Sequence, residues 1–229
     1  MNADRQPDKL GWLYIHRPMA YKEAWDLQNR LFDKRMRGDI PDVLFLTEHP
    51  PVYTFGKSGK IQHLLITEQH AKQKGIDLFW IDRGGDITFH GPGQLVGYPI
   101  FDLHGFYLDV GRFLRDVEEA LIVALAAFGI EAGRIPGLTG VWVGEEKIAA
   151  IGVKLSRWTT KHGFALNVNT DLSYFGHIVP CGIPDKPVTS MQKVLGHEVN
   201  METVIARVVR AFEQVFGIEL RPVKQAALV

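Results

Sequence analysis

Apolar residues recur along the chain with two different spacings, one typical of helices and one typical of strands. The helical spacing, in which side chains three or four positions apart share a face, is clearest between Asp109, which can cap a helix, and Gly129, which can end it. The same spacing followed by a glycine predicts other helices. The four predicted helices are residues 21–36, 67–74, 110–128 and 201–216.

Compact apolar or alternating runs between these helices predict strands, because glycine, proline and polar turn residues bound them. They are residues 10–16, 43–47, 52–55, 78–82, 95–103, 139–143, 147–155 and 163–168. The order of helix, several strands, helix, several strands and helix is not a regular alternation of strand and helix. We therefore predict an α/β or α+β fold with a mixed β-sheet flanked by helices. One domain is expected over residues 1–229, with an ordered core of about 10–217.

Composition mainly excludes classes of partner. The 229 residues are 46% hydrophobic and 23% charged with a formal net charge of zero, which favours neither a nucleic acid nor an anionic membrane as partner. No apolar run approaches the roughly 18 residues that cross a bilayer, and the first residues lack the apolar core of a signal peptide. We expect a cytoplasmic protein and a monomer.

The stretch 83–99 differs in composition from the rest of the chain. It contains five glycines and two prolines among β-forming residues, directly after the apolar run 78–81. Glycine reaches backbone conformations that are closed to other residues and lets a ligand or another backbone come close. Packing alone seldom needs so many such positions together, so we predict that a small molecule binds against this segment.

The single cysteine, Cys181, excludes an internal disulfide framework and a multi-cysteine zinc site. A lone cysteine is most often a small buried hydrophobic residue. Cys181, however, lies between Pro180 and Gly182, off any periodic apolar face, where a rigid turn can present a thiol. A nearby lysine, protonated histidine or helix N-terminus would lower the thiol pKa from about 8.5 and make it a nucleophile.

Lys147 is one candidate for that neighbour, although most lysines are simply surface charges. It begins a run of small and apolar residues that can line a narrow pocket, and the run ends at Gly152, where backbone can approach a ligand. When only the neighbouring residues in the sequence are considered, Lys154 and Lys161 are equally possible neighbours of the thiol.

The histidines leave several roles open. His90 can be a base, an oxyanion donor or a structural hydrogen-bonding residue, and His49, His162 and His177 are equally open. No HExxH motif or spaced histidine and cysteine cluster predicts a metal site. The Walker phosphate-binding pattern and the dinucleotide glycine fingerprint are also absent from the sequence. We therefore expect no metal and no other cofactor.

Together these motifs resemble those of the octanoyltransferases of lipoate biosynthesis, over about residues 10–217. The most specific are EHPPVYT at 48–54, RGGDITFHGPGQ at 83–94, KIAAIG at 147–152, HGFALNV at 162–168 and PCG at 180–182. Several separate motifs in the right order and with matching gaps carry more weight than a single glycine pattern.

The resemblance implies a single α/β domain related to the biotin and lipoate protein ligases. It also implies transfer of an octanoyl (or lipoyl) group from octanoyl-acyl carrier protein to a lysine. That lysine would lie on lipoyl domains of 2-oxoacid dehydrogenase complexes or on the glycine-cleavage H protein. Cys181 matches the nucleophile that becomes an acyl-thioester, and Lys147 matches the lysine that lowers its pKa. The implied substrate-binding residues are Arg83, Gly84, Gly85, Asp86, Ile87, Thr88, Phe89, His90, Ala150, Ile151, Gly152, Gly163, Phe164 and Ala165.

Simple chemistry agrees with this resemblance. Exchange between a thioester and a thiol is nearly balanced in energy, so the reaction needs no ATP, which fits the missing nucleotide motifs. Small residues such as Ala150 and Ala165 suit a slot for an unbranched chain, which gains about 0.8 kcal/mol per buried methylene. Two alternatives stay open: an ATP-dependent lipoate or biotin protein ligase on the same scaffold, and a non-catalytic acyl-binding protein.

Overall fold

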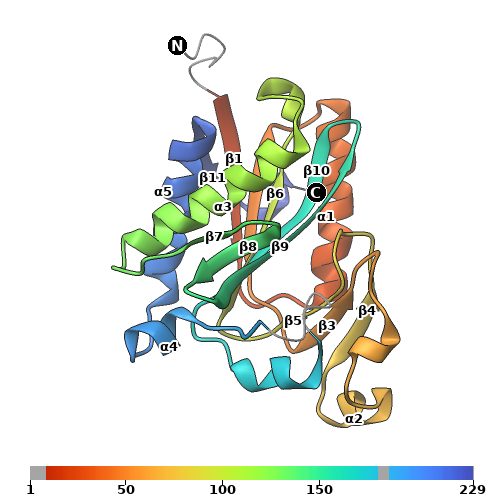
Figure 1. Ribbon diagram of the computed structural model, residues 1–229. Coiled ribbons are helices and arrows are strands. Elements are labelled where there is room, and N and C mark those ends of the chain that lie inside the picture. The colour runs from red at the N-terminus through yellow and green to blue at the C-terminus, as the bar shows by residue number, and fades with distance from the viewer. Residues whose placement is uncertain (1–8, 180–185, 229) are drawn as a thin grey trace.

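A large mixed sheet forms the centre of the protein (Figure 1). The computed structural model describes residues 9–179 and 186–228. The eight strands lie in the order β11-β1-β2-β6-β10-β9-β8-β7, with β1 parallel to both of its neighbours and the remaining pairs antiparallel. The strands are β1 (Lys9–His16), β2 (Asp42–Thr47), β6 (Gln94–Ile100), β7 (Gly133–Ile135), β8 (Leu138–Val143), β9 (Glu146–Ser156), β10 (Thr159–Asn167) and β11 (Ile218–Pro222).

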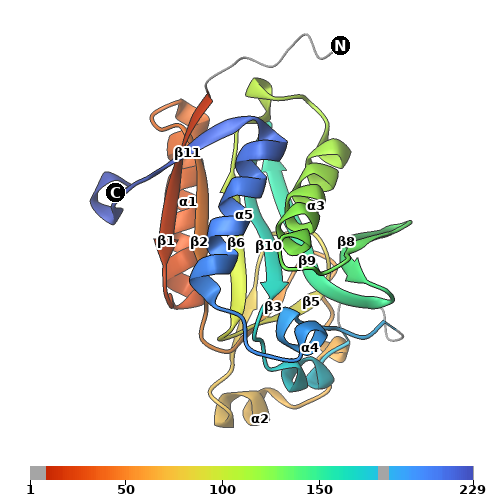
Figure 2. The ribbon, with the colours of Figure 1, turned by 90° about the vertical axis from the view of Figure 1, so that its left-hand side faces the viewer.

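Helices cover both faces of this sheet (Figure 2). The helices α3 (Val110–Ala126) and α5 (Met201–Phe216) pack on one face and on each other, and α1 (Tyr21–Arg37) packs on the opposite face against β6 and β10. The predicted caps are present, because the side chain of Asp109 accepts the amide proton of Arg112 and Asn200 accepts that of Thr203. Since both faces are covered, every residue of β6 and β10 is buried.

A second, three-stranded sheet lies beside the N-terminal end of α1 (Figure 1). Its order is β4 (Asp77–Trp80), β3 (Val52–Phe55) and β5 (Ile87–His90). The glycine-rich stretch predicted as a binding segment connects the two sheets, since it contains β5 and continues into β6. The remaining helical segments are η1 (Ile61–His63), α2 (Glu68–Gln73), η2 (Leu103–Gly105), η3 (Leu172–His177), α4 (Met191–Leu195) and η5 (Gln225–Ala227).

The predicted helices and strands are confirmed, with differences at their ends. β10 begins at Thr159 rather than at residue 163, because its first residues pair with the end of β9 in a hairpin. Arg157 and Trp158 form the turn with positive φ angles of 48° and 63°, a backbone shape that suits the twist of a tight hairpin. Within the described ranges 9–179 and 186–228, no helix is long and apolar enough to cross a membrane.

Candidate active site

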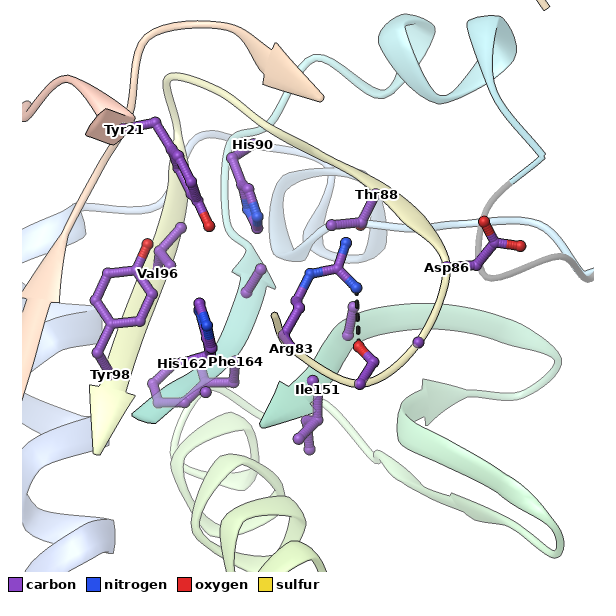
Figure 3. Close-up of a pocket in the computed structure, with 16 residues that line it drawn as sticks. Tyr21, Arg83, Asp86, Thr88, His90, Val96, Tyr98, Ile151, His162 and Phe164 are labelled. Atoms are coloured by element: carbon purple, nitrogen blue, oxygen red, sulfur yellow. Dashed lines mark hydrogen bonds between the residues drawn. The ribbon is translucent and has the colours of Figure 1, made fainter. Parts of the chain in front are cut away.

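The glycine-rich segment forms one wall of a cavity that encloses about 490 Å³, part of it open to solvent (Figure 3). The predicted pocket residues that line it are Arg83, Gly84, Gly85, Asp86, Thr88, His90, Ala150, Ile151, Gly152, Gly163, Phe164 and Ala165. They come from the loop before β5, from β5 itself and from the neighbouring strands β9 and β10. Three segments that are far apart in the sequence therefore meet around one space.

Two of the predicted pocket residues, Ile87 and Phe89, do not line this cavity. Successive side chains of a strand point to opposite faces, so Thr88 and His90 face the cavity while Ile87 and Phe89 face the other way. Both belong to the apolar core under the small sheet, where the Phe89 ring stacks on Tyr174 with centroids 4.6 Å apart. Their position indicates that they support the wall rather than contact a ligand.

Small residues in three cross-strand pairs form the floor of the cavity. Ala150 of β9 pairs with Ala165 of β10, and Ala165 pairs with Val96 of β6; we call these three residues the alanine row. Two positions further along, Gly152 pairs with Gly163, and we call this pair the glycine row. All five residues line a cavity, because residues two apart on a strand share a face.

The loop carrying Arg83 closes the cavity above the glycine row. The amide of Gly84 donates to the Val153 carbonyl at 2.9 Å, which brings the loop directly onto β9. A Cβ atom at Gly152 would lie 2.9 Å from the Gly84 carbonyl oxygen and 3.2 Å from Arg83 Cδ, so only glycine allows this approach. The guanidinium of Arg83 is fixed by hydrogen bonds to the carbonyl oxygen of Thr54 at 2.6 Å and to its hydroxyl at 3.0 Å.

A smaller cavity, with about 290 Å³ of empty space of which part is open to solvent, adjoins the larger one and is lined by Lys147. The two cavities share Thr88, Ala150 and Ala165 as lining residues. Lys147, Gln94 and Asn167 line the smaller one next to the alanine row, and we call these three residues the lysine row. Lys147 is 8% exposed, and its Nζ lies 4.7 Å from the centre of the Trp142 ring.

A β-bulge in β9 directs Lys147 into this cavity. Val141 pairs with Ala149 but the next residue, Trp142, pairs with Lys147, so Ile148 is an extra residue in β9. In a regular strand Lys147 and Ala150 would face opposite sides, since they are three residues apart. Across the bulge both line the smaller cavity, while Ile148 and Ala149 both join the main core.

A chain of hydrogen bonds connects the walls of the two cavities. Gln94 Nε2 donates to Asn167 Oδ1 at 2.9 Å, so Gln94 Oε1 is the atom that accepts from His90 Nδ1 at 2.8 Å. Burial lowers the pKa of His90 to about 3. His90 is thus neutral near pH 7, with Nε2 as its acceptor atom, 3.4 Å from the Thr54 hydroxyl.

His49 is a second buried, neutral histidine beside the larger cavity. Its Nδ1 must donate to the Met19 carbonyl oxygen, 2.7 Å away, so Nε2 accepts from the hydroxyl of Tyr98 at 2.7 Å. Burial lowers the pKa of His49 to about 4. His49 therefore orients Tyr98, whose side chain lines the cavity.

Sequence reasoning left out four residues that line the larger cavity: Tyr21, Val96, Tyr98 and His162. Val96 and Tyr98 lie on either side of Gly97 in β6, so the two-residue period of a strand places their side chains on one face. Which face borders the cavity is set by the neighbouring strands and cannot be predicted from β6 alone. His162 was among the histidines whose role stayed open. Its Nε2 donates to Asp82 Oδ1 at 2.7 Å.

The predicted nucleophile, Cys181, lies outside the described residues. On either side of it, the amide of Val179 donates to the His63 carbonyl at 2.8 Å, and the amide of Lys147 donates to the carbonyl of Pro187 at 2.9 Å. Val188 forms a bridge with Lys147 and lines the smaller cavity. Among the residues that are described, no group of three or more histidine, cysteine, aspartate or glutamate side chains could hold a metal ion.

The sequence and the fold belong to a known class of protein. The profile of the lipoyl protein ligase A/B catalytic domain matches residues 20–213, so the chain belongs to that family and, within it, to the octanoyltransferases. The octanoyltransferase of Solibacter usitatus is 54% identical over 202 residues, which is 88% of this chain and 91% of that protein. The octanoyltransferase of Rubrobacter xylanophilus is 53% identical over 199 residues, covering 86% of this chain and 89% of its own length.

Solved structures of ligases share the fold at low sequence identity. A lipoate-protein ligase A bound with ATP superposes with a TM-score of 0.74 at 17% identity, over 97% of this chain and 92% of that chain. The bipartite lipoate protein ligase of Thermoplasma acidophilum gives a TM-score of 0.73 at 19% identity, over 97% and 91% of the two chains. The biotin protein ligase of Aquifex aeolicus is more distant, with a TM-score of 0.52 at 12% identity, over 91% and 69%. The predicted kinship with biotin and lipoate protein ligases is confirmed at the level of the fold.

Proposed function

We propose that this protein transfers an octanoyl (or lipoyl) group from acyl carrier protein to a lysine of lipoyl domains, in the cytoplasm. The acceptors would be lipoyl domains of 2-oxoacid dehydrogenase complexes and the glycine-cleavage H protein. The observation that carries the proposal is Lys147, nearly buried in the smaller of two adjoining cavities that share Thr88, Ala150 and Ala165 as lining residues. That arrangement suits a cation beside a reacting thioester and an unbranched chain beyond it. The naming of the relatives as octanoyltransferases supports the same reaction.

Cys181 is the proposed nucleophile. Its thiolate attacks the carbonyl carbon of the acyl thioester, a new carbon–sulfur bond forms, the carbon–sulfur bond to the carrier protein breaks, and the carrier protein leaves as a thiol with a proton from Lys147. An ammonium near the thiol favours the thiolate by roughly 1.4 kcal/mol per unit of pKa shift. The backbone bonds of Lys147 to Pro187 and of Thr189 to Lys147 support this pairing, because both partners follow Cys181 closely in the sequence.

The second step releases the acyl group to the acceptor. The amine of the lipoyl-domain lysine attacks the Cys181 thioester, an amide bond forms, and the cysteine leaves as thiolate. The incoming group arrives as an ammonium, so two protons must be lost in all. Lys147, after giving up a proton in the first step, can take one of them, and solvent takes the other.

We propose that the residues lining the larger cavity hold the acyl chain and the arm that carries it. The apolar contacts come from Val96, Ile151 and Phe164 and from the alanine row, all of which line it. Arg83 and His90 are fixed by their own hydrogen bonds, so they offer a preorganised polar wall rather than free charges. Ile87 and Phe89, which lie on the far side of β5, support this wall from the core.

Mass spectrometry of the intact protein tests the proposal. Mixing it with octanoyl-acyl carrier protein without ATP should add the mass of one octanoyl group, and a lipoyl domain added afterwards should remove it. The Cys181→Ser variant should form no such thioester and should transfer at a small fraction of the normal rate. Transfer that requires ATP would instead favour a ligase, the reaction class of the proteins that share this fold, and an absence of adduct and transfer would favour an acyl-binding protein.

A further inference from the structure

A buried carboxylate on α3 is hydrogen-bonded to the strand beside Lys147. Glu118 is 0% exposed, and its Oε1 accepts the amide proton of Gly140 in β8 at 2.9 Å. Its Oε2 accepts from Arg134 Nε at 2.9 Å and forms an ion pair with Arg115 Nη1 at 2.7 Å. We call Glu118, Arg115 and Arg134 the carboxylate clamp. Two guanidinium groups thus compensate a carboxylate that burial would otherwise destabilise.

The carboxylate clamp joins α3 to the hairpin of β7 and β8, and β8 contacts this helix (Figure 2). Arg134 belongs to β7, and its Nη2 also donates to the carbonyl oxygen of Arg115 at 2.9 Å. The register of β7 against β8 shifts over the part of β8 that contains Gly140, so the backbone ladder is irregular there. Glu118 therefore supplies, from a helix, an acceptor for an amide in an interrupted ladder.

The side chain of Lys147 lies across the same part of β8. A Cβ atom placed on Gly140 would lie 3.3 Å from Lys147 Cε and 3.5 Å from its Cδ, so the lysine stem packs against the backbone of Gly140. Two residues further along β8, the centre of the Trp142 ring is 4.7 Å from Lys147 Nζ. β8 is therefore the surface on which this side chain rests. Because a packed interior transmits displacements, a shift of Gly140 changes where the ammonium lies.

We infer that Glu118 is a positioning residue for Lys147, acting through its hydrogen bond to Gly140. This inference rests on the proposed function, in which the ammonium of Lys147 stabilises the thiolate of Cys181. The attraction between two charges falls as they separate, so a displaced ammonium has a weaker effect on the thiol. Glu118 lines neither cavity, and it therefore acts on the position of Lys147 and not on the substrate.

Glu118→Asp separates the hydrogen bond to Gly140 from the charge of the clamp. The shorter side chain withdraws the carboxylate by about 1.5 Å, and the long side chains of Arg115 and Arg134 can follow it, whereas the backbone of β8 is tied to the sheet. We expect the pH of half-maximal alkylation of Cys181 by iodoacetamide to rise by about half a unit. Acylation by octanoyl-acyl carrier protein at pH 7 should fall about threefold, because half a pKa unit changes the thiolate fraction by that factor.

A double variant tests whether Glu118 acts through Lys147. In a protein that already carries Lys147→Ala, Glu118→Asp should cause no further shift of the alkylation profile, because the cation that it positions is absent. A role of Glu118 in the fold alone would give shifts that add in the double variant. Additive shifts would therefore overturn the inference.

Two further variants make the result decisive. Glu119→Asp is the matched control, because Glu119 is the next residue of α3 and accepts from the same Arg134 at 2.7 Å, whereas the amide of Gly140 is bonded to Glu118. It should keep the wild-type profile. Arg134→Met removes one guanidinium from a partly exposed position and leaves Glu118 paired with Arg115, so it should loosen the clamp and shift the profile in the same direction as Glu118→Asp.

The outcomes separate the inference from the function beneath it. Unchanged alkylation profiles in both the Glu118 and Arg134 variants, or an equal shift in the Glu119 control, would overturn the positioning role while leaving octanoyl transfer intact. A wild-type protein that forms no adduct on Cys181 would overturn the proposed function and the inference with it.

Discussion

Lys147 carries a charged ammonium at a nearly buried position, and the neighbouring side chains explain how that charge is stabilised. The face of the Trp142 ring attracts the ammonium, since the quadrupole of an aromatic ring is negative over its face. The polar side chains of Asn167 and Gln94 line the same small cavity. A cation held in this way can act on a neighbouring thiol without the competition of bulk water.

Replacing Lys147 by alanine should raise the pKa of the Cys181 thiol toward its ordinary value of about 8.5. We expect the acylation rate at pH 7 to fall at least tenfold, because a rise of one pKa unit removes about nine-tenths of the thiolate. The measurement is the pH dependence of alkylation of Cys181 by iodoacetamide. Lys193→Ala, an exposed lysine paired with Glu146, is the control, and an identical pH profile in the Lys147 variant would refute the role of Lys147.

At the scale of elements, the bulge in β9 depends on a glycine in the neighbouring strand. Gly140 of β8 has a φ angle of 131°, and its amide donates to the buried carboxylate of Glu118 on α3 at 2.9 Å. A Cβ atom there would lie 2.7 Å from the Ala149 carbonyl oxygen and 3.3 Å from Lys147 Cε. The position thus makes room for both the bulge and the lysine side chain.

Gly140→Ala should lower the free energy of unfolding by about 1–3 kcal/mol, because alanine is strained at this φ angle and collides with β9. It should also slow acylation, since Lys147 must move. Urea denaturation measures the free energy of unfolding, and the rate of adduct formation on Cys181 measures acylation. Gly133→Ala is the matched control, because a Cβ atom there meets nothing within 4 Å and Gly133 has no positive φ angle. Equal stability of the two variants would contradict this account.

Most elements could be predicted from sequence, because each carries its own local signal. The apolar stripe and the caps of α3 and α5 are complete within their own residues. The bulge at Ile148 could not be predicted, because it is defined by pairing with β8 and not by any residue in β9. The same holds for His162, whose hydrogen bond goes to Asp82, 80 residues earlier in the chain. The pocket motifs were found through a family resemblance, and the structure adds which face of each strand they occupy.

At the scale of the whole molecule, the buried neutral histidines make stability depend on pH. His49 and His90 have pKa values of about 4 and about 3 in the folded protein, whereas an unfolded chain protonates histidine near 6.5. Below pH 6.5 the two histidines therefore bind protons in the unfolded state but not in the folded state, and the free energy of unfolding falls as the pH is lowered. Asp82, whose pKa is lowered mainly by the hydrogen bond from His162, adds a further loss below about pH 4.

The free energy of unfolding should therefore decrease by about 4 kcal/mol between pH 7 and pH 5, about 2 kcal/mol for each histidine, as measured by urea denaturation at each pH. His49→Gln should flatten this slope, whatever its effect on stability at pH 7, because one of the two protonation sites is gone. His104→Asn, which changes an exposed histidine, should leave the slope unchanged. A wild-type protein whose stability is constant from pH 7 to pH 5 would disprove the assignment.

The row structure of the floor has a consequence for how substrate preference can change. In the proposed acyl site, the small residues of the floor recur at every second residue of their strands, so blocking one of these positions should move the end of the site by about one row. One row corresponds to about five or six carbons of an extended chain. Preferences in such a protein should therefore shift in jumps between short, medium and long acyl groups, and adjusting them by one carbon would require changes of side-chain size within a row.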